Sequence, residues 1–158
     1  MLAGPAAALY TAKREGGIDV GTVPAEWAAA RDTPSPFLVA ALGVDPKAPS
    51  TLSVVGSGQG GLAGLVASQL LGDGDVRFGA FAFWAGGRQR FAFFSWVGPS
   101  VGGMKRGKVS LQRAGVALAF TGTAGDLTWA GAEDLGVDAV EAKLVRGGAA
   151  DVTLSPPV

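Results

Sequence analysis

The stretch VRFGAFAFWAGGRQRFAFFSWV, residues 76–97, decides the predicted fold. Two aromatic segments, 76–83 and 90–97, are separated by WAGGRQ, whose length and glycines predict a β-hairpin. Because side chains alternate along a strand, the second segment should present Phe91, Phe93 and Val97 on one face and Ala92, Phe94 and Trp96 on the other. A strand that is apolar on both faces must be covered on both faces. We therefore expect two central strands with helices above and below the sheet.

The remaining segments predict helices and strands interleaved around this hairpin. Apolar spacing and turn residues indicate further strands at 37–44, 51–55 and 126–130, and helices at 22–32, 61–71, 104–120 and 132–146. The connection before the strand at 126–130 is long enough for a crossover, so we expect this strand to run parallel to its predecessor. The result is a mixed sheet with helices on both faces.

The last predicted helix carries a regular pattern of charges. Glu133 and Asp134 are expected in its first turn and Lys143 and Arg146 in its last, followed by Gly147 as a C-cap. The spacing of Glu133, Asp134, Asp138 and Glu141 is also compatible with a hard metal ion, but a solvated helix face is the favoured interpretation.

The composition limits the possible functions. A length of 158 residues fits one domain, and thirteen acidic and thirteen basic residues leave no net charge. An electrostatic partner must therefore be met by a local patch, and nucleic acid is not expected. The absence of cysteine and histidine excludes disulfides, thiol chemistry, histidine-based triads and the usual zinc ligands. No apolar run approaches the ~20 residues of a membrane-spanning helix.

A longer segment, 76–108, resembles the core signature of the actin-depolymerising-factor homology (ADF-H, or ADF/cofilin) domain family, in particular its coactosin-like members. The positions that match the pattern are Arg90, Phe91, Ala92, Trp96, Gly98, Val101, Gly103, Arg106 and Lys108. AKLVRGGAAD (142–151) is similar to the family's final helix and exit, and AARD (29–32) to the end of its first helix. The resemblance predicts an ADF-H domain over 18–151, between an N-terminal extension (1–17) and a C-terminal tail (152–158).

This resemblance implies both a fold and a function. The fold is α/β of the α+β kind: a mixed sheet of five to six strands, mostly antiparallel with one parallel strand, with helices on both faces. The implied function is binding to the side of actin filaments in the cytoplasm, by a monomer of the actin cytoskeleton without catalysis, cofactor or metal. Monomeric actin and anionic phosphoinositides are left open as further partners, and depolymerisation of the ADF/cofilin type is the alternative activity.

The resemblance also implies the binding residues. The family's filament contacts carry over to Arg90 and Arg146, and the bases at the start of the long helix are added as candidates. The predicted actin-binding set is Arg88, Arg90, Lys105, Arg106, Lys108, Arg113, Lys143 and Arg146. Gathered in one compact basic rim, such residues would orient docking on the acidic surface of actin.

The predicted long helix departs from the family pattern. Family members carry several lysines there, whereas VSLQRAGVALAF (109–120) has only Arg113. Gly115 also weakens the helix by about 1 kcal/mol relative to alanine. We expect this helix to lie deeper against the sheet and to offer less charge to actin, which leaves weak or lost binding as an alternative. The N-terminal extension (1–17) also departs from depolymerising family members, whose short N-terminus carries a serine that Met1-Leu2-Ala3 lacks. This difference favours side binding without severing.

Two other motifs indicate competing functions. GSGQGG (56–61) has the G-x-G-x-x-G spacing of a dinucleotide-binding loop between a predicted strand and helix, which leaves a small nucleotide-binding enzyme as an alternative. The acidic residue expected after the next strand is absent, so a glycine-rich turn is favoured. Trp84, Trp96 and Trp129 resemble a stacking platform for single-stranded nucleic acid, but their strands predict core positions. Trp84, at the hairpin, is the one tryptophan for which we allow exposure.

Overall fold

The aromatic stretch forms the predicted hairpin. Strands β3 (Val76–Ala85) and β4 (Arg88–Val97) pair over ten residues each and are joined by Gly86 and Gly87 alone. Both glycines have positive φ, 60° and 79°, which the favoured two-residue hairpin turn requires. The strands are therefore longer, and the connection shorter, than the sequence indicated. The structure is a computed structural model that describes residues 17–156.

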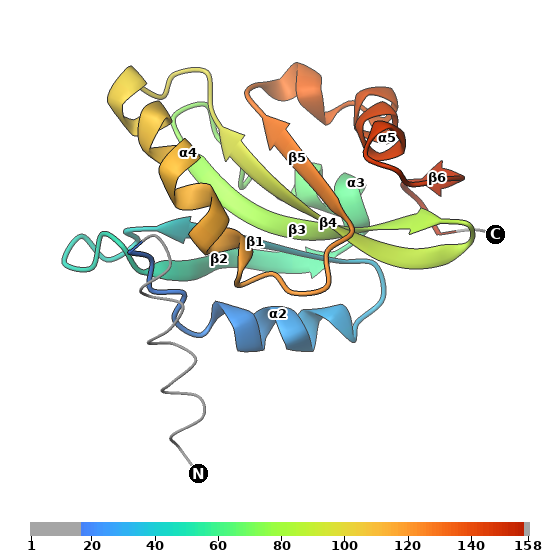
Figure 1. The fold of residues 1–158 in the computed structure, drawn as a ribbon, viewed down its shortest axis with the longest axis horizontal. Coiled ribbons are helices and arrows are strands. Elements are labelled where there is room, and N and C mark those ends of the chain that lie inside the picture. Colours follow the sequence, from blue (N-terminus) through green and yellow to red (C-terminus); the bar gives the residue numbers. More distant parts are fainter. Residues whose placement is uncertain (1–16, 157–158) are drawn as a thin grey trace, which may run out of the picture.

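The sheet around this hairpin is mixed, as predicted (Figure 1). Its strand order is β2-β1-β3-β4-β5, and a short sixth strand pairs with β3. Every pair is antiparallel except β4 with β5, which confirms the predicted parallel crossover. The bounds of the other strands are Pro36–Leu42 for β1, Leu52–Gln59 for β2, Gly125–Trp129 for β5 and Val152–Thr153 for β6.

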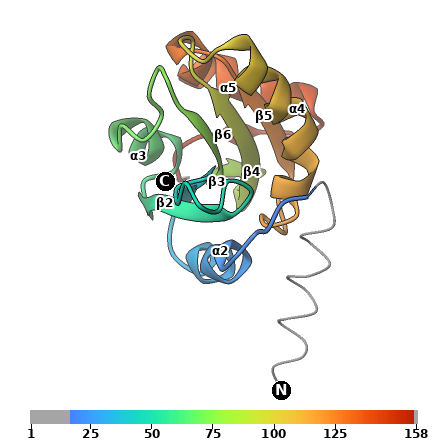
Figure 2. The same ribbon diagram turned by 90° about the vertical axis from the view of Figure 1, so that its left-hand side faces the viewer.

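Four α-helices, counted within residues 17–156, cover the two faces in pairs. α2 (Val23–Arg31) and α4 (Gly103–Ala117) pack on one face, whereas α3 (Gly61–Ala67) and α5 (Val137–Arg146) pack on the other (Figure 2). The two faces of β4 divide as the alternation predicts, since Phe93 belongs to the first cluster and Phe94 to the second. In the part of the chain described, no helix is long and apolar enough to cross a membrane.

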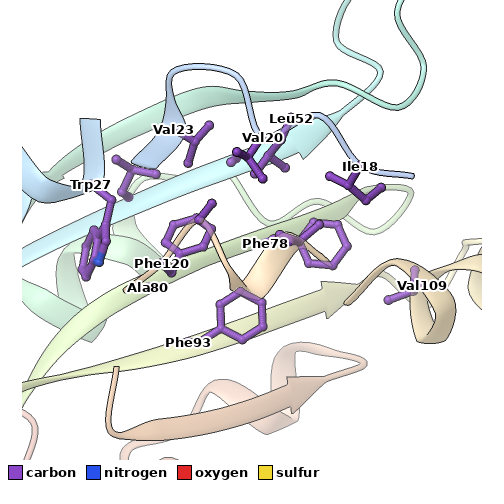
Figure 3. Close-up of a cluster of buried hydrophobic side chains, with 14 of the residues drawn as sticks. Ile18, Val20, Val23, Trp27, Leu52, Phe78, Ala80, Phe93, Val109 and Phe120 are labelled. Atoms are coloured by element: carbon purple, nitrogen blue, oxygen red, sulfur yellow. The ribbon is translucent and has the colours of Figure 1, made fainter. Parts of the chain in front are cut away.

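The face under α2 and α4 is built around aromatic side chains (Figure 3). Trp27 contacts Phe91 edge-on, with ring centroids 5.3 Å apart, and lies 5.8 Å from Phe120. Its indole N–H donates to the carbonyl of Thr121 at 3.0 Å, so the buried polar atom is satisfied. Each such side chain contributes about 1.5–3 kcal/mol of burial free energy, which fixes α2 and the end of α4 on the sheet.

The opposite face holds Trp96 and Trp129. Trp129 stacks on Phe94 and Phe81, with centroids 4.8 and 5.7 Å apart, and Trp96 is 1% exposed. The expectation that Trp84 could be exposed is wrong: its side chain is 7% exposed, because β6 pairs with β3 at this position. Since all four tryptophans are buried, they form no stacking platform for nucleic acid.

The predicted helix over 132–146 is interrupted. Ala132–Leu135 form a 3₁₀ helix, Gly136 is extended, and α5 begins only at Val137. Glu133 and Asp134 therefore lie outside the first turn of α5, which holds Asp138 instead. The carboxylate of Asp134 accepts the Ala130 N–H at 2.7 Å, which turns the chain out of β5 before the helix starts.

Candidate functional site

The predicted basic residues do not form one rim. They divide between the two ends of β4, because the hairpin precedes its first residue, Arg88, whereas α4 follows its last, Val97 (Figure 1). Ten residues of strand separate these ends by about 30 Å. We call Arg88, Arg90 and Arg146 the hairpin cluster, and Lys105, Arg106 and Lys108 the helix cluster.

The hairpin cluster gathers at the exposed start of β4 and the end of α5. Arg90 lines a hollow of about 410 Å³ together with residues 147–151, which directly follow Arg146. Arg88, Arg90 and Arg146 are exposed, and none of them has a salt bridge to a residue in 17–156. Lys143 does not join them, since its ammonium group donates to the carbonyl of Thr128 on β5 at 3.3 Å, and Thr128 pairs with Ser95 toward the other end of β4.

The helix cluster lies at the other end of the sheet. Lys105 and Lys108 are exposed and line a hollow of about 320 Å³ beside Arg77 of β3. Arg106 instead turns back, and its guanidinium donates to the carbonyls of Gly98 at 3.0 Å and Val101 at 3.3 Å. It thereby closes the loop between β4 and α4, and its guanidinium group has fewer free hydrogen-bond donors for a partner.

The position of these cations opposes the helix dipole. The first turn of α4 contains no acidic residue, and its N-terminal N–H groups carry partial positive charge. A cation there typically costs a few tenths of a kcal/mol or more. Lys105 and Arg106 lie in this first turn, whereas Lys108 lies in the next. Arg106 makes its two hydrogen bonds to backbone carbonyls, whereas Lys105 and Lys108 make no hydrogen bond or salt bridge within the part of the chain described. The charges of Lys105 and Lys108 therefore stay exposed at this end of the sheet.

Arg113 belongs to neither cluster. Its Nε donates to Ser95 Oγ at 3.0 Å, its two terminal nitrogens bind both carboxylate oxygens of Asp126, and one of them also donates to the carbonyl of Leu127 at 2.9 Å. The guanidinium lies 5.0 Å from the ring centroid of Phe93. These contacts join α4 to β4 and β5 and satisfy Ser95, the one fully buried polar side chain in the described core. The geometry gives Arg113 a structural role.

The exposed face of α4 carries an apolar stripe that the sequence reasoning missed. Met104, Leu111 and Leu118 lie seven residues apart on one side of the helix and are 82%, 78% and 50% exposed. The expectation that this helix lies deeper against the sheet is wrong, because only Val109, Gly115 and Val116 of its fifteen residues are buried. The seven-residue spacing was the signal available in the sequence.

The glycine-rich motif does not form a dinucleotide loop. Gly56 and Gly58 lie inside β2, which is antiparallel to β1, as is β3 on the other side of β1. β2 and β3 run in the same direction and are connected by α3, but β1 lies between them and is antiparallel to both. The neighbouring parallel strands of a dinucleotide-binding fold are therefore not formed here, and the first two glycines lie within a strand, not in a strand-to-helix loop. A side chain at Gly58 would meet the ring of Phe37 at 2.9 Å, so close packing explains the glycine. Residues 17–156 also hold no group of three or more acidic, histidine or cysteine side chains arranged for a metal.

Comparison with known proteins identifies the family. The sequence model of cofilin/tropomyosin-type actin-binding proteins matches residues 26–145. Among solved structures, coactosin from Entamoeba histolytica superimposes with a TM-score of 0.68 at 24% identity, covering 84% of this chain and 97% of that one. Human coactosin-like protein gives 0.67 at 18% identity, covering 82% and 97%. Cofilin from Streptomyces griseoflavus gives 0.66 at 14% identity, covering 78% and 95%.

The structural likenesses define the fold as that of ADF-H domains, with the predicted mixed sheet between helices. No curated protein sequence matches the chain significantly. Because the family model spans most of the sequence, the chain belongs to the cofilin/tropomyosin-type actin-binding proteins.

Proposed function

We propose that this domain binds the side of actin filaments, without catalysis and without strong severing. Family membership supports actin as the partner. The observation that carries the finer proposal is the hairpin cluster. Arg90 and the residues after Arg146 line one hollow, and these are the two bases that the resemblance maps onto filament contacts. Both side chains are exposed, so their charge is available to an acidic surface.

The second part of the proposal concerns the helix cluster. A filament presents repeated subunits, and two basic clusters about 30 Å apart can contact two of them at once. Monomeric actin would engage one cluster at a time and should bind more weakly, because the second contact gains from effective concentration. Lys105 and Lys108 then supply charge at one end of α4, and the apolar stripe supplies a contact that salt does not screen.

The location of the protein and its response to phosphoinositides follow from the proposed filament binding. A filament-side protein of this kind acts in the cytoplasm, on the actin cytoskeleton. Anionic phosphoinositides would compete for Lys105 and Lys108, which are the exposed bases beside Arg77. The proposed contacts omit Arg106 and Arg113, whose guanidinium groups already bind the fold.

Cosedimentation with filamentous actin at two salt concentrations tests the proposal. Binding should weaken as salt rises, because both clusters are exposed and screened. In parallel, pyrene-labelled filaments distinguish side binding from the ADF/cofilin-type alternative. Strong acceleration of filament disassembly would contradict side binding without severing, and no pelleting at either salt concentration would contradict filament binding altogether.

A further inference from the structure

The two edges of the sheet differ in how their backbone is protected. At one edge, β5 has five residues, and side chains bind its carbonyls: Arg113 donates to Leu127 and Lys143 to Thr128. At the other edge, β2 has eight residues. Its outer side is paired at its start, where the Leu52 N–H donates to the Asp19 carbonyl at 2.7 Å. Within the described chain, residues 53–59 have no backbone partner on that side.

β2 also lacks the charges by which edge strands usually avoid pairing with other strands. Its sequence, LSVVGSGQ, contains no charged residue and no proline. The neutral region is wider than the strand, because residues 48–72 contain no Asp, Glu, Lys or Arg. One extra residue, Val55, interrupts the register with β1 and twists the strand without adding charge. Apart from this bulge, the edge has none of the usual protections, and a row of unpaired backbone groups is a template for another strand.

The chemistry of this edge selects its partner. A charged strand would lose hydration here without meeting an opposite charge. A second β2 meets the requirement, because LSVVGSGQ paired antiparallel with itself brings no like charges together. Ser57 and Gln59, the exposed residues of β2, are small or uncharged polar side chains.

We propose that two copies of this chain associate through antiparallel pairing of their β2 strands, so that one sheet continues into the other. The proposed association differs from the monomer expected from the sequence. Neither basic cluster lies on β2, so both stay exposed in the pair. If each copy also binds a filament as proposed above, the pair would link two filaments. Only this consequence, and not the pairing itself, rests on the proposed function.

Sedimentation velocity of the full chain without actin tests this inference independently of filament binding. Over a concentration series up to about 1 mM, the unmodified protein should shift from monomer to dimer. Ser57→Lys should raise the dissociation constant at least about tenfold, because it places like charges at the joint. Ser100→Lys makes the same change in an exposed loop after β4 and should leave association unchanged.

A charge-swap experiment identifies the pairing geometry. Ser57→Lys and Ser57→Glu should each stay monomeric alone and associate when mixed, since opposite charges then meet. Amides of residues 53–59 in the unmodified protein should also exchange more slowly at high concentration than at low concentration. A monomer over the whole series, or Ser57→Lys associating like the unmodified chain, would overturn the proposal. A mixture that stays monomeric would overturn antiparallel β2 pairing.

Discussion

The two ends of the sheet carry similar basic residues that are held in different ways. At the hairpin end, Arg88 and Arg90 project from a strand with no hydrogen bond that occupies their guanidinium groups within residues 17–156. At the helix end, Lys105 lies in the first turn of α4, where the helix dipole disfavours a cation, Lys108 is exposed one turn later, and Arg106 closes a loop. A basic residue therefore indicates a binding partner only where its charge is not already bound by other groups of the fold.

The largest expected effect comes from the hairpin end. Reversing Arg90 and Arg146 to Glu replaces attraction by repulsion at both proposed contacts and should weaken filament binding about a hundredfold, roughly 2.7 kcal/mol. Quantitative cosedimentation gives the dissociation constant, and circular dichroism checks the fold. The control changes Ala25, Ala28, Ala63 and Val66 to Glu; these exposed positions on α2 and α3 lie outside both clusters, and together they shift the net charge equally. Equal binding by the test variant and the unmodified protein would exclude the hairpin cluster.

The sequence predicted the layers of the fold better than the arrangement of the site. The alternation of Phe93 and Phe94 is local, so a period of two was enough to assign them to opposite faces. Arg90 and Lys108 are only eighteen positions apart in the sequence, yet a strand carries the chain to the far end of the sheet between them. Proximity in sequence therefore suggested one rim where the fold forms two clusters.

Other features depended on distant partners. Arg113 has a structural role because it binds Ser95 and Asp126, which lie on two different strands. No local sequence pattern predicts such a network. The burial of Trp84 likewise depends on β6, which is too short for a periodic signal. The seven-residue spacing of Met104, Leu111 and Leu118 indicates the apolar stripe on α4. The comparison with the family pattern considered only the lysines of this helix.

Arg113, which lies between the clusters, should affect stability. Arg113→Met removes the donor that satisfies buried Ser95 and should lower the free energy of unfolding by about 2 kcal/mol. Urea denaturation followed by circular dichroism measures this change. Lys108→Met, an exposed position on the same helix, is the matched control and should change stability by less than about 0.5 kcal/mol. Similar losses in the two variants would contradict the structural role of Arg113.

The helix end should depend on apolar contact as well as charge. Met104→Ser with Leu111→Ser should weaken filament binding about fivefold, near 1 kcal/mol, and leave the salt dependence unchanged, because no charge is lost. Lys105→Ala with Lys108→Ala should weaken binding and also flatten its salt dependence. Val66→Ser on α3, an exposed apolar position on the other face, serves as control. If the serine variants bind with unchanged affinity, the apolar stripe lies outside the contact.

The smallest expected effect is on stability, and it distinguishes the helix end of the sheet from the hairpin end. Lys105→Glu puts a negative charge in the first turn of α4, where the dipole favours it, and should raise the free energy of unfolding by about 0.5 kcal/mol at low salt. The same substitution should weaken filament binding, so stability and function change in opposite directions at this residue. Lys47→Glu, in an exposed loop away from any helix terminus, should leave stability unchanged. Arg90→Glu at the hairpin end should bring no gain in stability either.

Urea denaturation at low and high salt measures the difference in stability, which salt should reduce because the dipole interaction is screened. A destabilised Lys105→Glu variant would show that Lys105 is held by the fold, and the helix cluster would then lose its assignment to a partner.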